Sequence, residues 1–215
     1  MRILQKSPLL IIVLLFPSLL KSQEIPFTFT KGKFVKEKIT ILSADIPRLK
    51  SAELFNSKIE IENMRIGNSK HLPDSIYIQR RVDELNAKKK SRGDEWLKGW
   101  EDSKSYYLPA FMEGYNTQIS TNKKVPGITI KEGLEFTIIL RPDTITVSNK
   151  YLASFLSMHL YIVSSKDNND TIASFKTFTF HIKDLSKIYP GSEASSFYMA
   201  GEMLARYFKK YMYKK

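Results

Sequence analysis

The stretch that decides the fold is "TIASFKTFTFHIK", residues 171–183. Its side chains change character at every second position, which is typical of a β-strand whose two faces meet different surroundings. One alternating set is Ala173, Phe175 and Thr177, and the other is Ile172, Ser174, Lys176, Phe178 and Phe180. We therefore expect a strand here, in a sheet that has one wet face.

Four further stretches have strand character, and a polar pentapeptide, KDNND at 166–170, predicts a hairpin loop before residues 171–183. The four stretches are residues 34–42 (FVKEKITIL), 58–64 (KIEIENM), 134–140 (LEFTIIL) and 151–164. The first two alternate between apolar and polar residues, and the last is a long apolar run.

Helical signals lie between these strands. Residues 73–90 begin with Pro73, which suits a first helical turn, and end on lysines that favour the negative end of the helix dipole. Residues 94–119 predict a second helix, which Pro109 should kink or divide near Tyr107. Residues 121–133 read as a polar connector with a turn at Pro-Gly.

A third helix is expected at residues 192–211, where Gly201 with Ala200 and Ala205 should let it lie close to the sheet. The order of elements predicts an α+β fold. We expect a mostly antiparallel sheet of about five strands, with two central helices and a C-terminal helix packed on one face. Residues 23–215 are expected to form a single domain.

Residues 1–22 have the pattern of a secretory signal peptide. A basic start precedes an uncharged apolar run at 8–20, and Lys-Ser-Gln follows at 21–23. The run is short for a membrane span, and a retained N-terminal anchor helix is the alternative interpretation. With cleavage expected after Ser22, the protein would be secreted or periplasmic.

Cysteine is absent and positive charge is in excess. Without cysteine, the chain has no disulfide, no thiolate nucleophile and no cysteine for a metal or a lipid anchor. The formal net charge is +12, or +9 for residues 23–215. This surplus favours anionic partners such as lipopolysaccharide, acidic polysaccharide or phospholipid headgroups, with a solvated basic surface as the alternative.

Both tryptophans lie in "SRGDEWLKGWEDSKSYYLPAF", residues 91–111. On a helix, Trp96 and Trp100 begin an aromatic series with four- and seven-residue spacing, which favours a packing stripe. The alternative is an exposed aromatic platform for a sugar or a lipid. Glu95 and Asp102 would then be the acid or base of a glycan hydrolase, although a solvated helix face explains them more simply. Helix capping explains the Arg-Gly-Asp triplet better than adhesion does.

The sequence contains no strong catalytic or cofactor motif. Only three histidines are present, and the zinc-protease, nucleophile-elbow and phosphate-loop patterns do not occur. His159 and His181 are expected on neighbouring strands, where a structural cross-strand pair is favoured over a metal site. We expect no catalytic residue, no metal and no cofactor, and a protein that is not an enzyme.

Three hydroxyl residues follow an Asp-Ser/Thr-aliphatic pattern: Ser75, Thr144 and Thr171. The pattern is similar to the O-glycosylation acceptor of secreted Bacteroidota proteins, in which the hydroxyl carries the glycan. The alternative is that these are ordinary helix, loop or strand-edge residues.

Four motifs carry a wider resemblance: "RGDEW" at a helix start, "EFTIILRPDTI" and "FLSMHLYIV" on paired strands, and "AGEMLARYFKKY" on a closing amphipathic helix. Together with the signal peptide, they make the chain resemble a family of uncharacterised secreted proteins of Bacteroidota. The resemblance implies a fold and an exported location, but no assigned activity.

Two functional hypotheses follow. The first is a non-catalytic secreted or periplasmic protein that binds an envelope protein or a polyanionic envelope component. Its contact surface would be an edge strand or the basic helix, with Arg80, Arg81, Lys88, Lys89 and Lys90. The second is a glycan-acting hydrolase or a glycan-binding module that uses the Trp96 and Trp100 region. Nucleic acid is the least favoured partner in this compartment.

Overall fold

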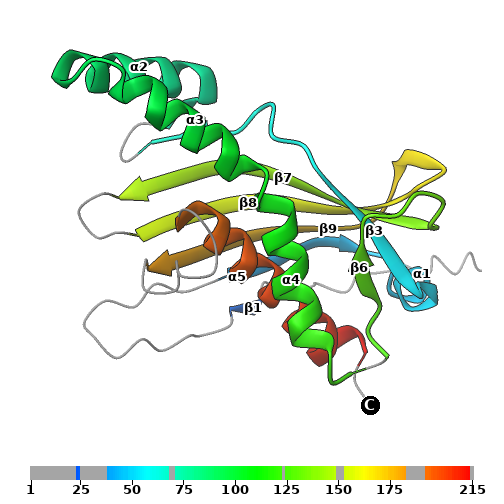
Figure 1. Cartoon of the computed structure of the whole chain (residues 1–215). Helices are drawn as coiled ribbons and strands as arrows, with labels where there is room; N and C mark the ends of the chain where they lie inside the picture. The colour runs from blue at the N-terminus through cyan, green and yellow to red at the C-terminus, as the bar shows by residue number, and fades with distance from the viewer. Residues whose placement is uncertain are drawn as a thin grey trace, which may run out of the picture.

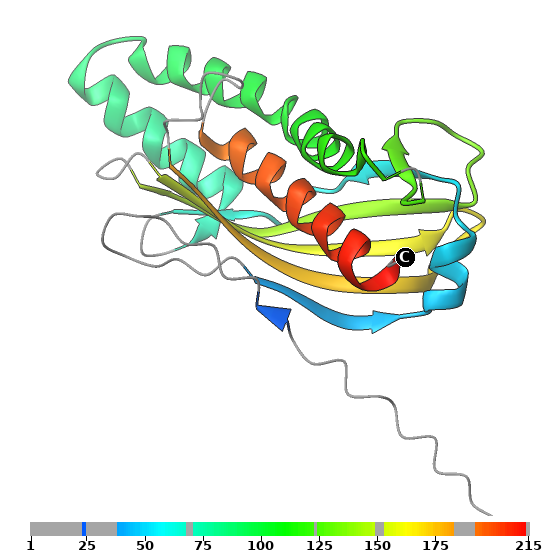
Figure 2. The same ribbon diagram turned by 90° about the horizontal axis from the view of Figure 1, so that it is seen from below.

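The computed structural model describes residues 23–24, 38–67, 71–122, 124–148, 153–182 and 192–213. The predicted signal peptide, residues 1–22, lies outside them. The fold is α+β, as expected: one twisted sheet has helices over one of its faces (Figures 1 and 2). Among the described residues, no helix is both long enough and apolar enough to cross a membrane.

The sheet has nine strands in the described part of the chain. Their bounds are β1 Gln23–Glu24, β2 Lys38–Ala44, β3 Leu54–Ile59, β4 Arg65–Ile66, β5 Leu72–Pro73, β6 Gly127–Thr129, β7 Phe136–Ser148, β8 Ala153–Ser164 and β9 Asp167–Ile182. The main order is β1-β2-β9-β8-β7-β3-β6, and β4 pairs with both β7 and β5.

The sheet differs from the expected five-stranded, mostly antiparallel one, because it has more strands and several of them pair in parallel. Strands β2, β9, β8 and β7 do pair antiparallel, but β3 runs parallel to both β6 and β7, and β4 runs parallel to β7. The strand expected at 58–64 lies earlier, at Leu54–Ile59, and residues 60–64 are not a strand. The strands that were missed altogether have only two or three residues, which is too short for alternation to be visible in the sequence. The parallel pairing depends on the helical connection between β3 and β7, which periodicity does not report.

Strand β7 also continues past Leu140, where the sequence indicated its end. Pro142 lies inside it, although proline has no N–H for a sheet ladder. The position is tolerated because β3 pairs with β7 only as far as Leu140, and β4 pairs with it from Thr144. Proline therefore occupies a local edge, and a bulge between Pro142 and Thr144 follows directly.

The helices are α1 Ile46–Ser51, α2 Asp74–Lys88, α3 Arg92–Lys104, α4 Tyr107–Ile119 and α5 Ser192–Tyr207, with a π-helical turn at Phe208–Met212. Helices α4 and α5 cover one face of the sheet, whereas α2 and α3 form a hairpin that projects beyond it (Figure 1). The predicted division of residues 94–119 is confirmed at Ser105–Tyr106. Pro109 becomes the third residue of α4, where a missing N–H costs no helical hydrogen bond.

Helices α4 and α5 cross in close contact because each presents a glycine to the other. A Cβ atom at Gly114 would overlap the carbonyl oxygen of Tyr198, and one at Gly201 would overlap the carbonyl oxygen of Phe111. The assignment of Gly201 to a contact with the sheet was therefore wrong. It faces another helix, because glycine permits approach to any backbone that lies near it.

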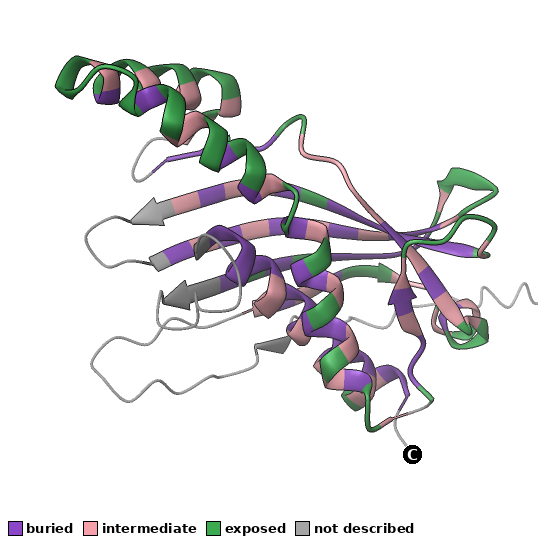
Figure 3. Ribbon diagram, in the orientation of Figure 1, coloured by how far each residue is buried: buried purple, intermediate pink, exposed green. Residues whose placement is uncertain are grey.

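The alternation that predicted β9 is confirmed only in part: Lys176 and Phe178 mark a wet face, but Ile172 and Ser174 of the same set are buried. Ala173, Phe175 and Thr177 are fully buried under the helices, and the core they join is the buried band of Figure 3. On the opposite face, Lys176 has half of its side chain exposed and Phe178 is 38% exposed. No described helix covers this second face (Figure 2).

Candidate functional site

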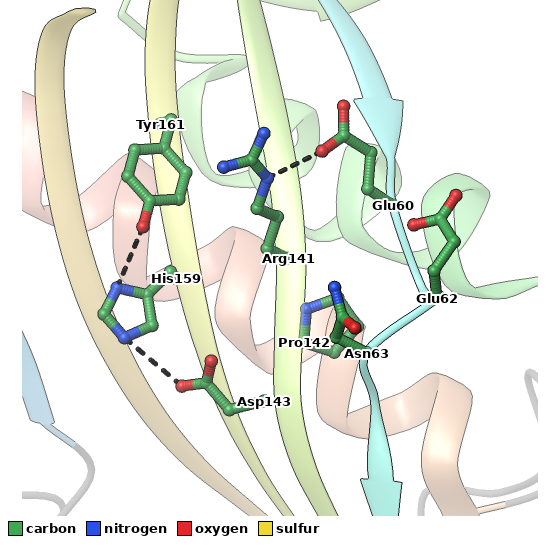
Figure 4. Close-up of a pocket in the computed structure, with 8 residues that line it drawn as sticks. All are labelled: Glu60, Glu62, Asn63, Arg141, Pro142, Asp143, His159 and Tyr161. Atoms are coloured by element: carbon green, nitrogen blue, oxygen red, sulfur yellow. Dashed lines mark hydrogen bonds and ion pairs between the residues drawn. The ribbon is translucent and has the colours of Figure 1, made fainter. Parts of the chain in front are cut away.

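A hollow of about 280 Å³ opens on the uncovered face of the sheet. It lies where the edge of β7 opposite β8 has no strand paired with it. The chain leaves β3 after Ile59 and does not rejoin β7 until Arg65, so a connecting segment crosses the gap. The backbone N–H of Glu60 donates to the carbonyl of Leu140 at 2.9 Å and fixes the start of this segment. The lining residues, drawn in Figure 4, are Glu60, Glu62, Asn63, Arg141, Pro142, Asp143, His159 and Tyr161.

One side of the hollow is held by an arginine. The Nε atom of Arg141 lies 2.6 Å from an oxygen of Glu60, and its guanidinium carbon lies 5.0 Å from the ring centre of Tyr161. Lys58 contacts the other oxygen of Glu60 at 3.0 Å. Partial burial would raise the pKa of Glu60, but the hydrogen bonds from Arg141 and Lys58 outweigh it, so the pKa lies below its ordinary value.

The other side is organised around His159. Its Nε2 atom lies 3.3 Å from Asp143, and its Nδ1 atom lies 3.4 Å from the hydroxyl of Tyr161 (Figure 4). The rings of His159 and Tyr161 are nearly parallel, with centres 6.0 Å apart. Asp143 reaches this position because it is the extra residue of the β7 bulge: Pro142 pairs with Met158 and Thr144 with Ser157.

A serine hydroxyl also contacts the polar side chains around the hollow. The hydroxyl of Ser157 donates to Asp143 at 3.3 Å. Further along β7, the hydroxyl of Thr146 lies 2.7 Å from Nε2 of His71, outside the lining of the hollow. Three or more metal-ligating side chains do not gather anywhere in the described ranges. What the hollow offers is a set of fixed donors and acceptors beside an aromatic ring.

The two strand histidines are on neighbouring strands, as expected, but they are not a pair. His159 on β8 stands opposite Lys176 on β9, whereas His181 on β9 stands opposite Ser154. His159 and His181 are therefore five residue pairs apart along the β8–β9 ladder. Sequence spacing could not fix this register, because the turn is shorter than the predicted loop and β9 already begins at Asp167.

The predicted basic residues lie on the projecting hairpin, away from the sheet. Arg80 is exposed on α2, and Arg81 is half-buried and binds Glu84 at 3.2 Å. At the end of the hairpin, four cations occur within five residues and all are exposed: Lys88, Lys89, Lys90 and Arg92. Among the described residues, none of these four takes part in an ion pair. We call these four residues the cationic tip.

The tryptophans lie at the base of this hairpin as a packed cluster. Trp100 is 6% exposed and Trp96 is half-buried; their rings stack at 5.6 Å, and Tyr77 contacts both. Glu95 and Asp102 are exposed on α3. Trp100 is thus a packing residue, as the helical spacing predicted. Of the two tryptophans, Trp96 is the one that is partly exposed.

The three hydroxyl residues of the predicted glycosylation pattern occupy different elements. Ser75 is exposed in the first turn of α2, Thr171 is exposed in β9, and Thr144 is half-buried in β7 beside the bulge. Their modification stays a prediction.

No family model matches the chain, and no curated protein matches it. Solved structures share part of its outline. The PelC dodecamer from Paraburkholderia phytofirmans is 8% identical, with a TM-score of 0.35 over 78% of this chain and 96% of that one. Protein XCC0632 from Xanthomonas campestris, of family DUF330, is 9% identical, with a TM-score of 0.36 over 73% of this chain and 83% of that one. Likeness at this level carries no argument about function.

Proposed function

We propose that this is an exported, non-catalytic binding protein whose cationic tip contacts a phosphate-bearing, anionic component of the cell envelope. The observation that carries the proposal is the exposure of Lys88, Lys89, Lys90 and Arg92 at the end of a projecting hairpin. Because these side chains have no ion-pair partner in the described residues, their charge is available to an external anion.

The tip differs in this respect from the rest of the hairpin. Elsewhere on α2 and α3, Arg81 pairs with Glu84, and Lys104 pairs with Asp74 and Glu101. Pairs of this kind satisfy their own charges and leave little net field for a partner. Arg80 and Lys98 are also exposed without an ion pair among the described residues, but each is a single cation, whereas the tip gathers four. The cationic tip is therefore the part of the hairpin that an anionic surface would attract.

The base of the hairpin supports a fixed presentation of the tip. The Nζ atom of Lys104 lies 2.7 Å from Asp74, so the end of α3 is tied to the start of α2. The stacked pair of Trp96 and Trp100 packs against Tyr77 at the same junction. A hairpin that is rigid at its base loses less conformational entropy on binding than a flexible arm does.

Vesicle binding tests the proposal. Neutral phosphatidylcholine vesicles are compared with vesicles that also contain phosphatidylglycerol, and a variant with Lys88→Glu, Lys89→Glu and Lys90→Glu is compared with the wild type. Each lysine near an anionic surface contributes about 1 kcal/mol. We expect binding only to the anionic vesicles, and a loss of at least about 100-fold in the variant.

The matched control carries the same change of charge elsewhere. Lys50, Lys131 and Lys166 are exposed residues outside the hairpin, and each is replaced by glutamate. If the tip is the contact, this control keeps most of the wild-type binding. If both triple variants lose binding equally, the attraction is a property of net charge and the tip has no special role.

Export is part of the same proposal, and it rests on the signal-peptide pattern at residues 1–22. We also infer from the four sequence motifs that the chain is related to the secreted Bacteroidota proteins that it resembles. Expression of the full chain in a bacterial host, followed by fractionation and mass spectrometry of the N-terminus, tests export. A product that begins near Gln23 outside the cytoplasm is expected, and an intact cytoplasmic product would contradict it.

A further inference from the structure

We infer that the hollow on the uncovered sheet face is a second binding site, which takes a neutral, polyhydroxylated ligand such as one sugar residue of a glycan. No described helix covers this face, and the hollow lies on β3, β7 and β8 rather than on the hairpin. It is therefore independent of the cationic tip. Its volume of about 280 Å³ is near the lower end of the ~300–1,000 Å³ that small-molecule sites usually have.

The hydrogen-bonding groups of the hollow are of both kinds. Carboxylates at Glu62 and Asp143 accept only, the guanidinium of Arg141 donates only, and the amide of Asn63 does both. A hydroxyl group donates and accepts, so neighbouring hydroxyls of one sugar can satisfy adjacent groups of opposite kind. A ligand with acceptors alone or donors alone would leave part of this lining unpaired.

The charges of the hollow disfavour an ion. An anion that approached Arg141 would also meet the carboxylates of Glu60, Glu62 and Asp143. A cation that approached Asp143 would meet Lys176, whose Nζ atom lies 3.9 Å from it. An ion of either sign would therefore be repelled by a like charge near the hollow. A neutral ligand avoids this electrostatic cost on entering.

The key groups are already fixed before a ligand arrives. Arg141 is held by Glu60 through Nε, and its guanidinium lies beside the ring of Tyr161 (Figure 4). His159 is held at both ring nitrogens, by Asp143 and by Tyr161. Groups that are ordered in advance reduce the entropy cost of binding, which matters most for a small polar ligand.

Three sugars with one ring and different charges test the inference: glucose, glucosamine and glucuronate. Each is titrated into the ¹⁵N-labelled protein, and amide shifts are followed by NMR. We expect glucose to move the amide signals of residues 60–63, Arg141, Asp143 and 159–161, with an affinity at least equal to that of either charged sugar. If a charged sugar binds there at least tenfold more tightly, or if no sugar moves these signals, the inference is overturned.

Variants at the rim of the hollow test whether glucose binds there specifically. Glu62 and Asn63 are exposed on the connecting segment, so the double variant Glu62→Ala, Asn63→Ala should fold normally. It is expected to weaken glucose binding at least about tenfold, because two hydrogen-bonding groups are lost. The control is Thr40→Ala, which lies on β2 and does not line the hollow. Equal binding by the rim variant and the wild type would contradict the assignment.

Discussion

The Nε atom of Arg141 lies 2.6 Å from Glu60, across a gap where the edge of β7 opposite β8 has no neighbouring strand. Glu60 is the first residue after β3, and Arg141 precedes the only proline of β7. The ion pair thus joins two segments that are 81 residues apart in the sequence. It fixes one wall of the hollow where the sheet ladder is interrupted.

The contribution of this pair to stability should depend on pH. Because the pKa of Glu60 is lower in the folded protein, its contribution is present above the ordinary pKa and is lost as the pH falls through the folded value. We expect Arg141→Gln to lower the free energy of unfolding by about 0.2–1 kcal/mol at neutral pH. Urea titrations at neutral pH and at about pH 3 measure this. An unchanged difference at the acidic pH would assign the effect to packing.

Burial of Glu193 should produce the opposite pH dependence. Glu193 lies in the first turn of α5 with 9% of its surface exposed, and burial raises its pKa. An acid with a raised pKa favours folding below its ordinary pKa, and that stability is lost as the pH rises through the folded value. Glu193→Gln is therefore expected to stabilise the protein at pH 7 and to have little effect at about pH 4. Thermal unfolding at both pH values provides the check, and destabilisation at pH 7 would refute this reading.

The crossing of α4 and α5 depends on glycine at two positions. Gly114→Ala and Gly201→Ala would each place a methyl group on a carbonyl oxygen of the facing helix, so each should cost at least about 1–3 kcal/mol. Gly99→Ala is the control, because nothing lies within 4 Å of its added Cβ atom in α3. It should stabilise the protein by up to about 1 kcal/mol. Chemical denaturation of the three variants decides the matter, and similar effects at all three positions would argue against the tight crossing.

Lys104 should tie the two helices of the hairpin together at its base. Its side chain is 13% exposed and lies 2.7 Å from Oδ2 of Asp74, whose Oδ1 atom is buried with no partner in the described residues. Lys104→Met is expected to cost about 1–3 kcal/mol, since it leaves the carboxylate with no cation. Adding Asp74→Asn should recover part of that loss, which a double-mutant cycle measures. Strictly additive effects would show that the two side chains do not interact.

The sequence predicted what depends on long, regular patterns. Strand β9 was visible from its alternation and β8 from its long apolar run, and the division of α3 from α4 was visible because Pro109 interrupts a helical run. Strands β4, β5 and β6 have two or three residues, and their pairing is set by tertiary contacts. The mixed character of the sheet could not be predicted for the same reason.

The hollow was not predicted because three distant segments form it. Glu60 follows β3, Arg141 lies on β7 and His159 lies on β8, and their meeting requires the parallel pairing of β3 with β7. One local signal was available: Arg-Pro-Asp within an apolar strand pattern, at 141–143, is typical of a bulge or a sheet edge. The exposed cations of the tip, by contrast, were recognisable from the sequence because they are adjacent in it.

The most direct test of the central claim is photo-cross-linking in the native envelope. A photoreactive amino acid replaces Lys89 in the cationic tip, and in a second strain it replaces Lys131, an exposed lysine outside the hairpin. The account predicts that position 89 yields an adduct with an anionic, phosphate-bearing envelope component and that position 131 does not. Adducts from position 131 alone, or the same adduct in equal yield from both positions, would contradict it.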